Sequence, residues 1–354
     1  MHKGVTWMKK VFSFVLFSIF LIALFAGCTN TAPQSIESEP TETENPYLSE
    51  NVLPWKYDAC AKAVQNGTME YYFMYSDDAV IKRTDGSGTS YKWGDSCLII
   101  FPHGETMLID SGYAGYAPIL TENLRRLGVR KIDYLLFSHS HHDHVGGAVS
   151  AGGVLENFEI GKVYYPAVDQ NYDFIAECIA DSLTPEDHEP LIAGDTRKFG
   201  DVTMTVLWPM PEHQGITYSN TDDVNDMSLV VRLEYKDHSS LFTGDIYRNL
   251  TIDGVLHQHV EEQLVEYYLQ QGKRELIDVD LLKVPHHGGS TSSGGKLLNT
   301  ATPKLSIATG YEEIIDGVKL RYGDYMLLSD RECGYIHVTA DGAGLLSYEC
   351  SRYQ

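Results

Sequence analysis

The hydrophobic and polar positions divide the chain into an apolar leader, a polar stretch and a long region of alternating strand-like and helix-like segments. Short apolar runs that are rich in β-branched and aromatic residues, with Gly and Asp at their ends, predict strands. These runs cover 70–75, 97–101, 106–109, 132–137, 162–165, 202–208, 229–235, 240–242, 281–284 and 305–308. Their distribution over both halves of the chain predicts a core of two sheets.

Two segments have the periodicity of helices that pack on such a core. One covers 116–127, between strand-like runs, and the other covers 255–271. In the second segment an apolar residue recurs at every fourth position from Leu256 to Tyr268, which predicts one buried face. His257 and His259 fall outside this face, so we expect both to be solvated.

The beginning of the chain has the composition of a targeting segment. Lys3, Lys9 and Lys10 precede an uncharged, mostly apolar run over 11–26. This run is shorter than the roughly 20 apolar residues of a membrane-spanning helix, and Cys28 follows closely. The pattern is typical of a bacterial lipoprotein signal, with Cys28 as the lipidated residue, and an uncleaved anchor helix is the alternative. Both interpretations predict an extracytoplasmic protein attached to the membrane by its N-terminus.

The stretch after the leader contains Ser, Thr, Pro and Glu but almost no large apolar residue. It cannot bury enough apolar surface to fold, which predicts a disordered tether. We therefore expect a signal peptide over 1–27, the lipidated cysteine and its tether over 28–46, and one folded domain over 47–354. The cysteines after Cys28 have wide spacing that fits no zinc motif, so we expect mostly buried thiols and at most two disulfides.

The formal net charge of -22 affects which partners are expected. An acidic surface repels polyanions, so a nucleic acid is expected only as a substrate that reaches a local positive site. Hydrophobic residues at 43% and charged residues at 21% are ordinary for a soluble globular domain. No feature of the sequence indicates an obligate protein partner.

One motif directly after the strand-like run 132–137 carries candidate chemistry. A strand end followed by a tight loop can point several side chains into one mouth, and paired glycines let the backbone turn close to it. Imidazole and carboxylate groups are ligands that zinc prefers, so the motif predicts a metal site. It has the spacing HxHxDH and consists of Ser138, His139, Ser140, His141, His142, Asp143, His144, Val145, Gly146 and Gly147.

The motif resembles the hallmark of the metallo-β-lactamase superfamily, and further segments resemble its ComEC-like branch. In the order of that branch, these segments are 94–100, 102–104, 107–112, 193–195, 199–202, 225–230, 241–245 and 282–288. The resemblance implies an α/β fold, the αββα four-layer sandwich of the superfamily. It also implies a hydrolase that uses two divalent metal ions, with zinc expected and manganese as the alternative.

The resemblance also implies which residues bind the metal ions. His139 and His141 correspond to ligands of one ion. Asp143 and His144 correspond to ligands of the second ion, and Asp245 corresponds to a carboxylate that bridges both.

Three further residues are expected around these ligands. Of the adjacent His286 and His287 one should face the mouth, because two neighbouring histidines cannot both point into a core. We predict that His286 completes the second site and keep His287 as the alternative. Asp110 is expected to accept a hydrogen bond from a ligand imidazole and to fix its tautomer.

The chain departs from the wider superfamily at 225–228. Many members supply a further His to the first metal ion there, whereas this chain has Asn225, Asp226, Met227 and Ser228, as the ComEC-like branch does. The first site is therefore expected to be weaker or partly water-ligated. His287, or Asn225 and Ser228, could donate hydrogen bonds to a substrate or protonate its leaving group.

Together these expectations describe an extracellular, lipid-anchored, metal-dependent hydrolase, with a phosphodiesterase as the leading interpretation. A metal-bridging hydroxide would attack an anionic phosphodiester, and the ions would make the mouth locally positive. The ComEC-like branch implies a nuclease-like substrate, and likeness to wall-associated phosphorylcholine esterases implies teichoic acid. The alternatives are a lactonase or other ester hydrolase, and a non-catalytic surface binding module that contains metal.

Overall fold

The computed structural model describes residues 52–75, 79–82, 89–92, 94–168, 172–180, 183–214, 221–309 and 316–352. All of them belong to one compact unit, Glu44–Gln354. The expected signal peptide over 1–27, the lipidated Cys28 with its tether over 28–46, and the first residues of the expected domain, 47–51, lie outside the described residues. Within the described ranges, no helix has both the length and the apolar character that crossing a membrane requires.

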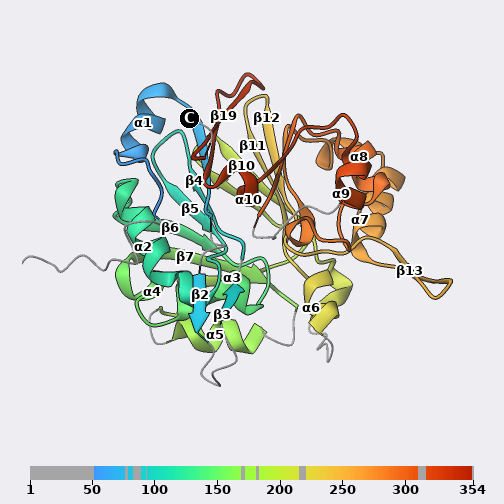
Figure 1. The fold of residues 1–354 in the computed structure, drawn as a ribbon, viewed down its shortest axis with the longest axis horizontal. Helices are drawn as coiled ribbons and strands as arrows, with labels where there is room; N and C mark the ends of the chain where they lie inside the picture. Colours follow the sequence, from blue (N-terminus) through green and yellow to red (C-terminus); the bar gives the residue numbers. More distant parts are fainter. Residues whose placement is uncertain are drawn as a thin grey trace, which may run out of the picture. The chain divides into compact units, whose positions relative to one another are not determined.

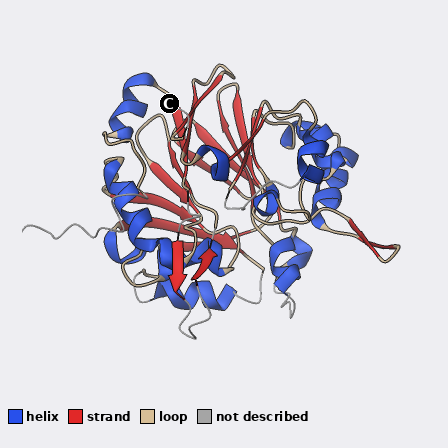
Figure 2. Ribbon diagram, in the orientation of Figure 1, coloured by secondary structure: helices blue, strands red, loops and turns tan. Residues whose placement is uncertain are grey.

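Two β-sheets with helices around them form this unit (Figure 1, Figure 2). The strand order is β19-β18-β1-β4-β5-β6-β7-β8 in the first sheet and β17-β16-β15-β12-β11-β10-β9 in the second. The first sheet contains β1 (Met69–Phe73), β4 (Cys97–Ile100), β5 (Thr106–Ile109), β6 (Lys131–Leu136), β7 (Glu159–Pro166), β8 (His188–Leu191), β18 (Ile336–Ala340) and β19 (Leu346–Cys350). The second contains β9 (Thr196–Phe199), β10 (Val202–Trp208), β11 (Val230–Tyr235), β12 (His238–Phe242), β15 (Leu281–Lys283), β16 (Leu305–Ala308) and β17 (Leu327–Ser329).

The described helices are α1 (Ala59–Asn66), α2 (Ala117–Arg126), α3 (His142–Val149), α4 (Val154–Asn157), α5 (Tyr172–Ala180), α6 (Thr221–Asp226), α7 (Val260–Gln270), α8 (Gly295–Ala301), α9 (Asp316–Tyr322) and α10 (Asp330–Cys333). Two small hairpins are separate from the sheets, namely β2 (Ala79–Lys82) with β3 (Thr89–Lys92), and β13 (Leu250–Ile252) with β14 (Val255–His257). Short 3-10 turns lie at Ala114–Tyr116, Pro211–His213, Arg274–Leu276 and Pro285–Gly288.

The alternation of side chains along the strands builds the layers. Tyr71 of β1 packs between the two sheets with Leu233 of β11. Its neighbour Tyr72 points to the opposite face, in a cluster with Leu120 of α2. A third cluster joins the outer face of the second sheet to α7 and α8, and it includes Leu264. The order helix, sheet, sheet and helix confirms the predicted αββα sandwich.

The structure agrees with most of the predicted elements and corrects one of them. Every predicted strand overlaps an observed strand, and the helix predicted over 116–127 is α2. The helix predicted over 255–271 is wrong at its start, because residues Val255–His257 form β14 and pair with β13. Leu256 is 57% exposed there, so it does not belong to the buried face of α7.

The expectation that His259 is simply solvated is also wrong. Its Nδ1 lies 2.6 Å from Oδ2 of Asp226, and its ring packs edge-on against Tyr247. His257 is exposed, as expected. The Cys residues of the described ranges have free thiols, and Cys97, Cys333 and Cys350 are buried.

Gly147 allows α3 to lie directly against the loop after β5. A Cβ atom at this position would lie 2.0 Å from the carbonyl oxygen of Ser111, far closer than van der Waals contact permits. The Ser111 hydroxyl donates a hydrogen bond to His144 O at 2.8 Å and accepts one from the Ala148 N–H at 2.9 Å. This close packing fixes the first turn of α3 beside the end of β5.

Gly147→Ala should lower the free energy of unfolding, although alanine favours helices more than glycine by about 1 kcal/mol. The added methyl group must displace backbone, and overpacking typically costs about 1–3 kcal/mol. Urea denaturation measures the change. Gly295→Ala at the start of α8 is the control, because no atom lies within 4 Å of its added Cβ. Equal unfolding midpoints for the two variants would contradict this account.

Candidate metal centre

The candidate site lies where strand ends from both sheets meet. In the first sheet β5 runs parallel to β6, and in the second sheet β12 runs parallel to β15. The carboxyl ends of parallel strands lie at the same edge of a sheet, so the loops that follow them are neighbours. These loops carry Asp110, the HxHxDH motif, Asp245 and the His286-His287 pair.

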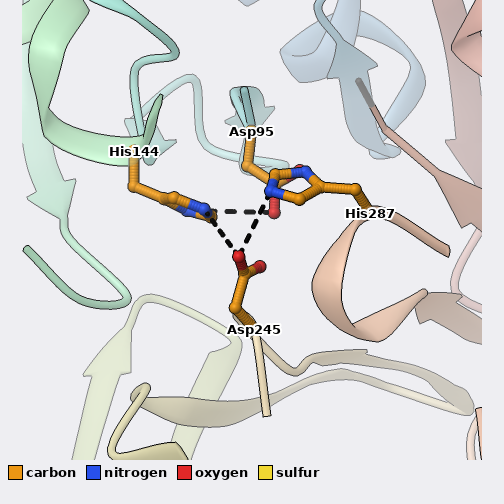
Figure 3. Close-up of side chains that lie close together, drawn as sticks. All are labelled: Asp95, His144, Asp245 and His287. Carbon is orange, nitrogen blue, oxygen red and sulfur yellow. Dashed lines mark hydrogen bonds and ion pairs between the residues drawn. The ribbon is translucent and has the colours of Figure 1, made fainter. Parts of the chain in front are cut away.

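The carboxylate of Asp245 is at the centre of the site, and its residue is 2% exposed. Its Oδ2 atom lies 3.1 Å from Nε2 of His144 and 3.2 Å from Nε2 of His287. Nε2 of His139 is 3.9 Å from the same oxygen. Figure 3 shows the His144 and His287 rings pointing at Asp245 from opposite sides. Ring nitrogens carried by both sheets therefore converge on one oxygen atom.

The surrounding donors fall into two groups that share Asp245. Nε2 of His139 lies 3.0 Å from Nδ1 of His141, so both nitrogens face one point. On the other side, Oδ2 of Asp143 lies 3.4 Å from Nε2 of His287, next to His144. We call these the His139 group and the His144 group. The number of ions that they hold stays a prediction.

Two further carboxylates orient the rings of the His144 group. Nδ1 of His144 donates a hydrogen bond to Oδ2 of Asp110 at 2.9 Å, which is the contact expected for Asp110. Nδ1 of His287 lies 3.1 Å from Oδ1 of Asp95 and 2.9 Å from the carbonyl oxygen of Thr309. A proton held on Nδ1 leaves the Nε2 lone pair free for a metal ion.

Asp95 is held in turn by Lys283, a cation buried at the end of β15. The Lys283 ammonium forms a close ion pair with Oδ2 of Asp95 and lies 3.7 Å from Oδ1 of Asp245. It also donates a hydrogen bond to the carbonyl oxygen of Gly244 at 3.1 Å. The Asp95 carboxylate lies close enough to His144, Asp245 and His287 to share an ion with them. Its oxygens are already bound to Lys283, His287 and Thr309, so we assign it the role of orienting the His287 ring.

The two adjacent histidines occupy the positions opposite to those that we predicted. His287 belongs to the His144 group, whereas Nδ1 of His286 is hydrogen-bonded to the Thr291 hydroxyl and its ring packs on Tyr247. Both residues have left-handed backbone, with φ of 42° at His286 and 56° at His287. Such a conformation costs on the order of 1–3 kcal/mol per non-glycine residue. The geometry therefore favours His287 as the ligand.

The two candidates for contacts with substrate just before β11, Asn225 and Ser228, lie in different environments. Ser228 is fully buried, and its hydroxyl accepts the Asp245 N–H at 3.0 Å. This contact holds Asp245 and leaves Ser228 away from any substrate. Asn225 is also buried, and its Nδ2 donates to the Tyr247 hydroxyl at 2.6 Å.

The pKa shifts separate the two groups of donors. Burial lowers the pKa of His139 and of His141, and the nearby His144 lowers both further. Burial also lowers the pKa of His144 and of His287, but Asp245 and the orienting carboxylates raise both well above the ordinary value. Burial raises the pKa of Asp245, but His144 and His287 hold it well below its usual range. Without metal, these shifts favour neutral rings at His139 and His141 and protonated rings at His144 and His287.

These residues fit a divalent metal ion. Imidazole nitrogens and carboxylate oxygens are the donors of catalytic zinc sites, which keep a position open for water or substrate. Buried polar atoms are normally paired, yet Oδ1 of Asp245 and Nε2 of His287 make no hydrogen bond. A cation between the two groups would satisfy both atoms.

The comparisons with known proteins agree with this fold and site. The Metallo-beta-lactamase superfamily model matches residues 92–308, more than half of the chain. The chain therefore belongs to this superfamily, and its buried His/Asp cluster has the composition and spacing to bind a metal ion.

Its curated relatives are distant ComEC-like proteins. It is 27% identical over 222 residues to the uncharacterized protein YcaI of Escherichia coli K12, which covers 60% of this chain and 23% of YcaI. It is 23% identical over 237 residues to ComE operon protein 3 of Bacillus subtilis, covering 60% of this chain and 26% of that protein. The chain thus spans about a quarter of the length of these relatives. Among solved structures, the metallo-beta-lactamase fold protein YhfI of Bacillus subtilis has a TM-score of 0.43 and 13% identity, covering 74% of this chain and 95% of YhfI.

Sequence reasoning missed Asp95 and Lys283. A lysine inside the apolar run 281–284 was a signal that could have found one of them, because lysine is almost never fully buried unless it is paired. The pattern does not reveal its partner, since residues 95 and 283 meet only after both sheets have formed. Thr309, whose hydroxyl also hydrogen-bonds Asp95, gave no signal.

Metal binding to the purified protein should release protons. His144 and His287 have pKa values well above 6.5 without metal, so both carry a proton at pH 7 that ligation must displace. We expect release of about two protons per protein, and affinity that increases with pH until these groups are neutral. Calorimetry in buffers of different ionisation enthalpy measures the release. Binding without proton release would show that both rings are already neutral.

His287→Gln and His286→Gln should differ in metal content. Loss of the His287 ring removes a donor and should lower metal affinity by at least about 10-fold, whereas loss of His286 should leave affinity unchanged. Metal analysis after dialysis against the ion distinguishes the two variants. The reverse result would restore His286 as the ligand.

Proposed function

We propose that this protein is a metal-dependent hydrolase of anionic phosphodiesters. The convergence of two donor groups on Oδ2 of Asp245 carries the proposal, because this arrangement is suited to two adjacent ions. Enzymes with two-ion sites of this kind hydrolyse phosphate esters, and some of them hydrolyse other substrates. Zinc is the expected ion and manganese the alternative.

The residues around the centre support an anionic substrate in spite of the net charge of -22. Arg248 donates from Nε to the Ser290 carbonyl oxygen at 3.0 Å, and Arg321 donates to the Ser292 and Ser293 carbonyl oxygens, each at 2.8 Å. This loop follows the two histidines directly. Two guanidinium groups lie beside this loop together with the carboxyl groups of Glu261 and Glu262, so the arginines and the bound ions together would supply the local positive charge that attracts a phosphodiester.

The reaction requires activated water and a proton for the leaving group. Divalent ions held by the two donor groups would supply Lewis acids that activate water near neutral pH. Asp95 and Asp110 keep the proton of each ring in the His144 group on Nδ1, so Nε2 faces the centre. These carboxylates therefore determine which nitrogen faces the substrate side.

His286, in place of His287, is suited to donate a hydrogen bond to the leaving oxygen; burial lowers its pKa to about 4, so its ring is neutral near pH 7. Its Nδ1 is bonded to the Thr291 hydroxyl, so when that hydroxyl donates, the ring proton sits on Nε2. The side chain is only partly buried, unlike that of His287. A partly exposed N–H beside the donor groups is placed to hydrogen-bond a substrate oxygen.

We further propose that the protein acts outside the cytoplasm, attached by lipid at Cys28. The support is the leader with its lysines and apolar run, and the polar tether that follows. The substrate would then be nucleic acid, as the resemblance of the sequence segments to the ComEC-like branch implies, or a phosphodiester of the cell wall such as a phosphorylcholine-substituted teichoic acid.

The test is hydrolysis of bis-p-nitrophenyl phosphate and p-nitrophenylphosphorylcholine by the metal-loaded protein. We expect turnover that falls at least about 100-fold in His141→Ala, because a donor of the His139 group is lost. His257→Ala is the matched control, since His257 is exposed on β14, and it should keep full activity. The preferred ester distinguishes the nuclease-like substrate from the choline ester.

Two other outcomes would contradict the proposal. Turnover of lactones or carboxylic esters alone would assign the site to another ester hydrolase. Full metal occupancy without turnover of any ester would leave a surface binding module that contains metal.

A further inference from the structure

The two donor groups are unequal in the number of protein ligands that they supply. The His144 group has a carboxylate and two ring nitrogens in addition to Asp245. The His139 group has only the converging nitrogens of His139 and His141 in addition to Asp245. Zinc usually binds four ligands, and catalytic zinc three protein groups with one open position. The His139 group is therefore short of protein ligands by comparison with its neighbour.

Asn225 is a buried amide whose oxygen makes no hydrogen bond. The residue is 5% exposed, and Oδ1 is among the buried polar atoms without a partner. Leaving a buried carbonyl unpaired costs about 1–3 kcal/mol, so such an atom needs an explanation. Its Nδ2 donates to the Tyr247 hydroxyl at 2.6 Å, which fixes the plane of the amide.

The segment that carries Asn225 lies against the loop of the His139 group, because the Leu229 N–H donates to the Ser138 carbonyl oxygen at 2.7 Å and the Ser228 N–H donates to the Asn225 carbonyl oxygen at 3.0 Å. The Asn225 side chain is also within reach of His141, and this contact raises the pKa of that ring against the larger lowering by burial and by His144. Ser228, one turn further along the chain, is occupied by the Asp245 N–H, and Asp226 accepts from His259 and from the Tyr247 N–H. Of these three polar side chains, only Asn225 has an oxygen that accepts no hydrogen bond of normal geometry.

We propose that the amide oxygen of Asn225 completes the ligand set of the ion held by His139 and His141. The inference rests on the proposed metal-dependent function. An amide oxygen is a neutral, hard donor, so it binds a divalent ion less strongly than an imidazole or a carboxylate does. The ion of the His139 group is therefore the weaker of the two, and Tyr247 acts as a positioning residue that holds the amide plane.

The experiment is titration of the metal-free protein with Co²⁺, followed by calorimetry and by the visible absorption of the ion, which reports its coordination. We expect two binding steps, with one step weakened about 10–100-fold in Asn225→Ala and the other unchanged. His139→Ala should remove the same step and so identify it. Asn225→Asp should keep both steps, because a carboxylate oxygen replaces the amide oxygen.

Two controls separate ligand loss from general damage. Asn157→Ala makes the same substitution at the end of α4, outside the centre, and should leave both steps unchanged. Asn225→Leu keeps the side-chain volume without an oxygen donor, so it replaces Asn225→Ala if that variant does not fold.

The outcomes distinguish this inference from the proposed function. Unchanged Co²⁺ steps in Asn225→Ala and Asn225→Leu overturn the inference, and so does a wild-type protein that binds a single ion. Ester hydrolysis in either case leaves the proposed function standing. Conversely, a selectively weakened step without hydrolysis of any phosphodiester supports the ligand role and contradicts the function.

Discussion

The buried carboxylate of Asp245 is the constraint on which the rest of the site depends. A carboxylate removed from water costs several kcal/mol unless charges and hydrogen bonds compensate it. Here His144 and His287 approach one oxygen, and Lys283 lies near the other. His144 follows β6 of the first sheet, whereas Lys283 and His287 lie at the end of β15 in the second sheet, so the site can form only when the two sheets are packed together. The same arrangement leaves room for a cation of higher charge.

Without metal, the two donor groups differ in how they compensate the buried charge of Asp245. The rings of the His144 group hold protons, whereas His139 and His141 are neutral because burial and the charge on His144 lower their pKa values. A metal ion entering the His144 group must displace protons, and an ion entering the His139 group need not. The affinities of the two groups therefore depend on pH in different ways.

The orienting contacts explain why a large part of the fold serves a small site. Asp110 follows β5, Asp95 precedes β4 and Lys283 ends β15, and together they fix which nitrogen of each ring faces the centre. Gly147 contributes by having no side chain, since any Cβ there would separate α3 from the Ser111 loop. The strained backbone at His286 and His287 then directs one ring inward and the other toward Thr291.

The sequence by itself determined the strands, the two-sheet fold class and most of the donors, because apolar periodicity and the HxHxDH spacing are local properties of the chain. It gave the wrong start for α7, since a four-residue spacing cannot separate one turn of helix from a hairpin strand such as β14. Only the tertiary structure decided between His286 and His287, paired Lys283 with Asp95 and left Oδ1 of Asn225 without a partner. These contacts join residues from different strands and loops, many of them far apart in the chain, and their geometry depends on packing that no local pattern records.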